Sequence, residues 1–185
     1  AINVALLLPP AALERVRTIN AKLYAQRPDG FLFDETHLPH VTLLQQFVSQ
    51  KNLPDLLLHM ENIVADQEPV TLHALGVSEG GTALLLTLAR TPSLQHWHER
   101  LMCITADFSS PAGTASAFHG DEAPARERDV RWVQEYRHAA AFDQFSPHIT
   151  LGFGDVGEFP VAFSVTTNRL AICHLGRFCT CRIVL

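Results

Sequence analysis

Apolar residues follow two patterns along the chain, short strand-like runs and longer amphipathic stretches. The strand-like runs predict β-strands at residues 2–8, 38–48, 70–77, 82–89, 145–153, 159–166 and 170–185. Apolar residues at helical spacing predict α-helices at residues 11–26, 53–65, 91–106 and 125–140. Strands and helices are mixed without strict alternation, which favours an α+β fold with antiparallel sheets.

Turn-forming residues separate several of these segments. Residues 28–30 (Pro-Asp-Gly) end the first predicted helix, residues 78–81 (Ser-Glu-Gly-Gly) connect two strands in a predicted hairpin, and Gly176 lies in a predicted turn. The stretch 109–124 is rich in Ser, Pro, Gly and Ala, which predicts an irregular segment. Since no linker is evident, we expect residues 1–185 to form a single domain.

Length and composition are those of an ordinary soluble globular protein. The chain has 185 residues, of which 47% are apolar and 18% charged, so it can bury a sizeable core. Its net charge of −5 argues against a non-specific grip on long nucleic acid, which needs a basic surface. A small anionic substrate in a local pocket remains compatible with this charge.

The sequence gives no signal for secretion or for a membrane span. The apolar residues 2–8 lack a basic segment before them and a convincing cleavage site after them. No apolar stretch approaches the length that crosses a bilayer. We therefore expect a cytoplasmic protein.

The four cysteines do not follow the spacing of a zinc site. If residues 170–185 are strands, Cys179 and Cys181 share one face near His174, which makes a metal site conceivable. Buried, reduced thiols are the favoured interpretation. The four are Cys103, Cys173, Cys179 and Cys181.

One five-residue motif occurs twice. Residues 39–43 read Pro-His-Val-Thr-Leu, and residues 147–151 read Pro-His-Ile-Thr-Leu. Because side chains alternate faces along a strand, each motif presents its His and Thr on one face and turns two aliphatic side chains to the other. If the two strands lie close together, they form one site from four side chains, those of His40, Thr42, His148 and Thr150.

Two other interpretations of these histidines are less favoured. A single histidine on a strand is more often a structural residue than a catalyst, and the chain contains ten histidines. The matching frames of His40 and His148 favour a functional pair instead. A metal site needs further ligands, and the frames supply no carboxylate or third histidine at matching spacing. We therefore predict neither a metal nor a cofactor.

The two motifs, together with the first strand and the Gly152-Phe153 that follows the second motif, resemble the two-histidine (2H) phosphoesterase superfamily. That superfamily includes cyclic nucleotide phosphodiesterases and proteins called 2′-5′ RNA ligases. The resemblance covers essentially the whole chain in order and length. It implies a bilobal fold with two small antiparallel sheets, outer helices and a central groove that carries both H-x-T motifs. It also implies catalytic roles for His40, Thr42, His148 and Thr150.

The chemistry of these residues suits a cyclic phosphodiester. Its hydrolysis needs a base that activates water and an acid that protonates the leaving ribose oxygen, and histidine can do either near neutral pH. Threonine hydroxyls can donate hydrogen bonds to the non-bridging phosphate oxygens. Either histidine could be the acid. The resemblance implies that a 2′,3′-cyclic phosphate is opened to a 2′-phosphate.

Phe153 is a candidate substrate contact five residues after His148. Strict alternation would turn Phe153 away from His148, but Gly152 and Gly154 on either side permit a bend. The ring could then stack on a base, or it could pack in the core.

Two further candidates have weaker support. Gln45 follows His40 by five residues and could hydrogen-bond a base or a phosphate. Trp132 lies on the predicted helix 125–140 and could contact a substrate. Tyr136 on the same helix, with Arg131 and Arg137 close by, is a weaker candidate for the same role.

We therefore expect metal-independent hydrolysis of 2′,3′-cyclic phosphodiesters of nucleotides or short RNA ends. One alternative is a 2′-5′ phosphodiesterase or RNA ligase-like enzyme that acts on oligonucleotides. The other is a non-catalytic nucleotide-binding module, which would not require two proton-transfer groups. Related sequences can carry a basic residue where this chain has Phe153, which argues against long RNA as the substrate.

Overall fold

The computed structural model describes residues 1–64, 68–120, 123–155, 157 and 162–185. Its strands form two antiparallel sheets. The first sheet has the strand order β5-β2-β1-β8-β9. Its strands are β1 (Ile2–Leu7), β2 (His40–Val48), β5 (Ser109–Ser110), β8 (Leu170–Leu175) and β9 (Cys181–Val184). The second sheet has the order β6-β4-β3-β7. Its strands are β3 (Val70–Gly80), β4 (Ala83–Leu88), β6 (His148–Gly152) and β7 (Phe163–Thr167).

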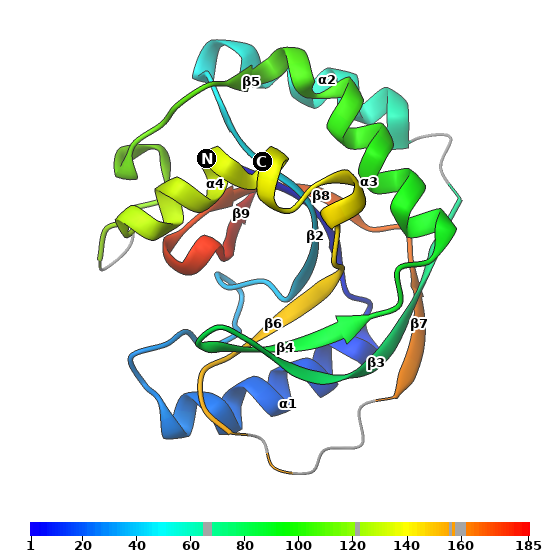
Figure 1. The fold of residues 1–185 in the computed structure, drawn as a ribbon, viewed down its shortest axis with the longest axis vertical. Helices are drawn as coiled ribbons and strands as arrows, with labels where there is room; N and C mark the ends of the chain where they lie inside the picture. The colour runs from blue at the N-terminus through cyan, green and yellow to red at the C-terminus, as the bar shows by residue number, and fades with distance from the viewer. Residues whose placement is uncertain (65–67, 121–122, 156, 158–161) are drawn as a thin grey trace.

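The helices lie around these two sheets (Figure 1). The described residues form the α-helices α1 (Pro10–Gln26), α2 (Leu53–Val64), α3 (Pro92–Ile104) and α4 (Glu127–Ala139). Short 3₁₀ turns are η1 (Gln50–Asn52), η2 (Ala106–Phe108), η3 (Ala115–Ala117), η4 (Phe142–Gln144) and η5 (Arg177–Cys179). The α+β fold with two antiparallel sheets that the sequence predicts is confirmed.

The path of the chain ties the two sheets together. Helix α1 follows β1 of the first sheet but packs against β6 of the second, and its buried apolar residues include Val16, Ile19 and Leu23. Helices α3 and α4 both contact β2. The apolar side chains of the two motifs point into one hydrophobic core, as predicted, and at most 1% of each is exposed. They are Val41, Leu43, Ile149 and Leu151.

Two predicted segments differ from the structure, and a predicted turn is present. Strand β3 continues through residues 78–80, so the hairpin turns at Gly81, whose φ of +69° suits glycine. The stretch 109–124 is not wholly irregular, because Ser109 and Ser110 pair with β2 and η3 follows. The predicted turn at Gly176 is confirmed, because the segment 170–185 forms two strands with Gly176 and η5 between them.

The break at η5 corrects the prediction for the cysteines. Phe178 and Cys179 have φ of 64° and 55°, a left-handed conformation that a strand cannot contain. Cys179 therefore lies in a turn and does not share a strand face with Cys181. All four cysteines are free; Cys173 and Cys181 are buried as predicted, but Cys103 is exposed.

Three of the predictions fall partly outside the described residues. These are the helix end at residue 65, the strand start at residue 159 and part of the segment 109–124. No helix of the described chain is both long and apolar enough to span a membrane.

Candidate active site

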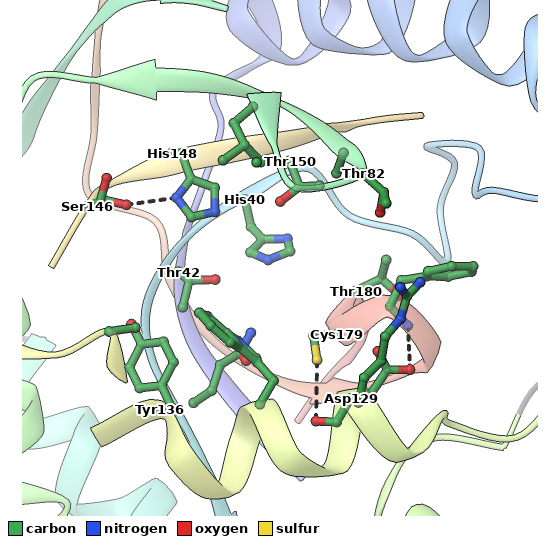
Figure 2. Close-up of a pocket in the computed structure, with 18 of the residues that line it drawn as sticks. His40, Thr42, Thr82, Asp129, Tyr136, Ser146, His148, Thr150, Cys179 and Thr180 are labelled. Carbon is green, nitrogen blue, oxygen red and sulfur yellow. Dashed lines mark hydrogen bonds between the residues drawn. The ribbon is translucent and has the colours of Figure 1, made fainter. Parts of the chain in front are cut away.

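The two motif strands belong to different sheets and contact each other at one pocket. The cavity has a volume of about 560 Å³ and is lined by His40 and Thr42 from β2 and by His148 and Thr150 from β6. Figure 2 shows these side chains converging on the middle of the pocket. The structure thus brings together the four residues that the repeated motif predicts.

Both motif histidines are oriented by the same kind of hydrogen bond. Nδ1 of His40 lies 2.7 Å from the carbonyl oxygen of Leu38, and Nδ1 of His148 lies 2.7 Å from that of Ser146. A carbonyl can only accept, so each Nδ1 donates its proton and Nε2 is the unprotonated nitrogen of the neutral ring. Because both rings point into the pocket (Figure 2), Nε2 is the nitrogen that faces a substrate.

Burial holds both imidazoles neutral near pH 7. It lowers the pKa of His40 from 6.5 to about 4, an effect that the hydrogen bond to Leu38 opposes and the nearby His148 increases. Burial also lowers the pKa of His148, against the hydrogen bond to Ser146. An anionic phosphate between the rings would raise both pKa values, since it favours the charged form. A bound anion thus favours a proton on one imidazole of the pair.

The hydroxyl of Thr42 is oriented by a buried amide. Nδ2 of Asn3, a residue that is 0% exposed, donates to Oγ1 of Thr42 over 3.0 Å. A hydroxyl that accepts one hydrogen bond still has its own proton to donate. Thr42 can therefore donate into the pocket.

An irregularity in each motif strand decides which later side chain reaches the pocket. Val4 pairs with Leu44 and Ala5 with Thr42, so Leu43 has no partner across the ladder. An extra residue of this kind is a β-bulge, and it reverses the alternation of faces after it. Gln45, three residues after Thr42, consequently lines the pocket with only 5% of its surface exposed.

The second motif strand has the same irregularity at the same place. Leu84 pairs with Gly152 and Leu85 with Thr150, so Leu151 has no partner. Phe153 therefore lines the pocket on the same side as Thr150. The bend that Gly152 was predicted to permit is present, with its φ at +137°.

Phe153 is part of an aromatic wall. Its ring lies 6.0 Å from that of Phe31 and 5.3 Å from that of Phe178, and Phe33 lies 5.3 Å from Phe31. All four rings line the pocket, and Phe153 also packs on the hydrophobic core. Both the stacking and the core interpretations of Phe153 are thus compatible with its place.

Helix α4 supplies another wall. Trp132 lines the pocket, as does Tyr136, together with Arg128 one turn earlier. Arg131 and Arg137 lie next to these residues in sequence but do not line this pocket: Arg131 lines a separate surface groove, and Arg137 donates to the carbonyl of Met102. The spacing of Trp132 and Tyr136 already indicates the correct face, because residues four apart share a side of a helix.

Arg126 joins α4 to the turn η5. Its guanidinium hydrogen-bonds both carboxylate oxygens of Asp129 and lies 4.1 Å above the ring of Phe178. The Asp129 carboxylate also accepts from the main-chain N–H of Phe178, and Sγ of Cys179 donates to the main-chain carbonyl of Asp129 (Figure 2). Burial raises the pKa of the Cys179 thiol, which keeps it protonated. The left-handed turn is thereby fixed against the pocket.

Sequence reasoning missed several lining residues. Arg126 and Phe178 belong to no recognisable sequence motif. Phe31 and Phe33 do carry a signal, because residues two apart lie on the same side of an extended segment. Among the residues that the structure describes, no group of three or more His, Cys, Asp or Glu side chains could hold a metal ion.

Comparisons with known proteins bear on this site. The sequence model of the 2′-5′ RNA ligase superfamily matches residues 8–158, which include both motifs. TT0787 of Thermus thermophilus has a similar fold, with 15% identity and a TM-score of 0.63 over 100% of this chain and 94% of that one. E. coli LigT complexed with 3′-AMP is similar with 19% identity and a TM-score of 0.51 over the same shares. No curated protein matches the sequence significantly.

Proposed function

We propose that this chain, which belongs to the 2′-5′ RNA ligase superfamily, hydrolyses 2′,3′-cyclic phosphodiesters of nucleotides or short RNA ends. One observation carries the proposal: His40 and His148 line one pocket, each with Nδ1 bound to a main-chain carbonyl and Nε2 turned to the substrate side. Such a pair can supply a base and an acid to opposite sides of one phosphorus atom.

The proposed reaction is an attack of water on the cyclic phosphate. One neutral imidazole takes a proton from the water as its oxygen bonds to phosphorus. The bond from phosphorus to one ribose oxygen breaks, and the other imidazole, protonated, gives its proton to that oxygen. The product is a phosphate monoester, and we propose that the 3′-oxygen leaves, which gives a 2′-phosphate. Thr42 and Thr150 donate to the non-bridging oxygens as negative charge develops there.

Substrate recognition is proposed for three other pocket residues. The ring of Phe153 can stack on a base, and Trp132 of α4, which also lines the pocket, has a second aromatic surface. Gln45 offers a side-chain amide whose oxygen is buried without a hydrogen-bond partner in the described chain. The complex of the similarly folded E. coli LigT with 3′-AMP supports a small nucleotide as the ligand class.

A second candidate is an enzyme that acts on 2′-5′ linkages of oligonucleotides. The name of the superfamily favours it, and so do Arg126 and Arg128, which line the same pocket and could contact a further phosphate. The two candidates share the site and differ in the substrate.

A panel assay separates them. The purified protein is incubated with the four nucleoside 2′,3′-cyclic phosphates, with 2′-5′ and 3′-5′ dinucleotides, and with 3′,5′-cyclic nucleotides. Phosphorus NMR identifies the products. We expect turnover of the 2′,3′-cyclic phosphates to 2′-phosphates, and little of the rest. Turnover confined to 2′-5′ dinucleotides would select the second candidate, and tight binding of every compound without turnover would contradict both.

A further inference from the structure

Two buried polar side chains hold the two bulges of the motif strands. Nδ1 of His98, on α3, donates to the carbonyl of Leu43 over 2.5 Å. Nδ2 of Asn20, on α1, donates to the carbonyl of Leu151 over 2.8 Å. Leu43 and Leu151 are the residues without a partner across their ladders, and both His98 and Asn20 are 0% exposed. The same arrangement thus occurs at both bulges with a different side chain.

His98 also bonds to the segment that leads into the second motif. Its Nε2 accepts the main-chain N–H of Phe142 over 2.8 Å, and its ring stacks in parallel on Phe145 at 4.0 Å. Phe142 has a φ of 56°, and its carbonyl accepts hydrogen bonds from Arg90 and Gln95. His98 therefore connects the strand of the first histidine to the turn that precedes the second.

Asn20 has the corresponding second role on the other side of the pocket. Its Nδ2 also donates to the carbonyl of Phe31 over 3.0 Å, and its Oδ1 accepts the N–H of Phe33 over 2.6 Å. Asn20 therefore connects the second motif strand, just before Phe153, to the segment that carries two rings of the aromatic wall.

We propose that His98 and Asn20 are positioning residues: His98 fixes the two catalytic imidazoles relative to each other, and Asn20 fixes the aromatic wall relative to the second motif. This proposal rests on the proposed function, since it assigns roles within that same site. A bulge takes a main-chain carbonyl out of the ladder, and a buried carbonyl needs a donor. A displacement of about 1 Å in a catalytic group can reduce the rate about 100-fold.

The hydrogen-bonding capacity of each side chain supports a connecting role over simple filling of the core. His98 uses both ring nitrogens, one as donor and one as acceptor, which requires the neutral ring; burial lowers its pKa accordingly. Asn20 uses its amide for three partners on two segments. A side chain that only satisfied one bulge would need a single donor.

Substitutions at His98 test the first half of the proposal. His98→Asn can keep the bond to Leu43 but not that to Phe142, His98→Gln can do the reverse, and His98→Phe removes both. We expect kcat on a nucleoside 2′,3′-cyclic phosphate to fall about 10-fold in the first two variants and about 100-fold in the third. KM should change less than about 3-fold, because the acid and the base act in the transition state and not in substrate binding. The control is Thr105→Val, which removes a buried hydrogen bond to the carbonyl of Leu101 at the end of α3.

Substitution of Asn20 tests the second half. We expect Asn20→Leu to raise KM about 10-fold and to lower kcat less, because it disturbs the surface for the base rather than the imidazoles. If Asn20 acts by positioning the ring of Phe153, the two effects are not independent. The double variant Asn20→Leu/Phe153→Leu should then raise KM by clearly less than the product of the two single effects. Independent, multiplying effects on KM would overturn this half.

A spectroscopic measurement separates a failure of this proposal from a failure of the proposed function. In proton NMR, the Cε1–H signals of His40 and His148 should shift in His98→Phe and stay in place in Thr105→Val, and the Phe142 amide should lose protection from exchange. These signals can be read even if the wild-type protein turns over no cyclic phosphate, an outcome that would reject the proposed function alone. Unshifted imidazole signals, or a loss of kcat in Thr105→Val equal to that in His98→Phe at the same stability, would reject the role of His98.

Discussion

Gln45 and Phe153 occupy equivalent positions in the two halves of the pocket. Each lies five residues after its motif histidine, and each reaches the pocket because the leucine two residues before it leaves the strand pairing. The matching His and Thr pairs are thus followed by unlike side chains in the same pocket, an amide in the first half and an aromatic ring in the second. We expect a substrate with a phosphate at one end and a base at the other to bind in one preferred orientation, because the residues that follow the two motifs differ.

Substitution of either motif histidine should abolish most of the activity. We expect His40→Ala and His148→Ala each to lower kcat at least about 100-fold, the usual contribution of a general acid or base. Thr42→Ala and Thr150→Ala should cost less, since other donors still hold the phosphate. The matched control is His96→Ala, an exposed histidine of α3. Near-normal turnover in a correctly folded His40 or His148 variant would falsify the assignment of the site.

The pH profile should be bell-shaped and displaced to acid. Burial lowers the pKa of both imidazoles in the free enzyme, to about 4 for His40. The group that must be protonated therefore loses its proton below pH 6.5, and we expect kcat/KM to reach its maximum below pH 6.5 and to fall as the pH rises. In the complex the phosphate raises these pKa values, so the maximum of kcat should lie at higher pH than that of kcat/KM. The two apparent pKa values belong to the pair of imidazoles rather than to single residues. A maximum of kcat/KM above pH 6.5, or at a higher pH than the maximum of kcat, would contradict this prediction.

Chelators should leave the activity intact. The proposed reaction moves its protons through two imidazoles and stabilises charge through two hydroxyls, so it needs no Lewis acid. Turnover of a nucleoside 2′,3′-cyclic phosphate is measured after dialysis against excess EDTA. Loss of turnover that a divalent ion restores would identify a metallohydrolase instead.

The ring of Phe153 should contribute to binding more than to catalysis. We expect Phe153→Leu, which keeps most of the apolar volume, to raise KM about 10-fold, as loss of one base stack would. The fall in kcat should be smaller. Phe163→Leu on β7, outside the pocket, is the control. Equal KM values for the two variants would leave Phe153 a core residue without a role in stacking.

Arg128 should contact a phosphate beyond the reacting one only in an oligonucleotide. For a decamer ending in a cyclic phosphate, we expect Arg128→Gln to reduce the slope of log(kcat/KM) against log salt by about 0.7, the share of one phosphate contact on a single strand. Arg131→Gln on the same helix faces a different groove and should leave the slope unchanged. With the mononucleotide both variants should behave like the wild type. A steep wild-type slope with a strong preference for the decamer would favour the RNA-directed candidate.

Much of the fold follows from local patterns in the sequence. Helix α1 has apolar residues at helical spacing and begins after Pro9, and Thr91 caps α3 through its hydroxyl as Pro92 opens it. The repeated motif likewise predicts the four central side chains of the pocket. These signals are readable because each depends on residues close together in the chain.

The features that local patterns do not predict depend on distant partners. The bulges at Leu43 and Leu151 exist because β1 and β4 skip these residues, and strict alternation would have turned Gln45 and Phe153 away. The left-handed turn at Phe178 is held by Asp129, about fifty residues earlier in the chain. His98 was one of ten histidines in the sequence, and only the fold distinguishes it from the others.

The first sheet joins strands from far apart in the sequence, since β1 lies between β2 and β8. During synthesis both motifs are made before residues 170–184. Without these residues β1 has one open edge, and the pocket lacks Phe178 and Thr180, which both line it. We therefore expect activity to begin only after these residues have emerged from the ribosome. Turnover would then report that β8 and β9 have been added to the first sheet.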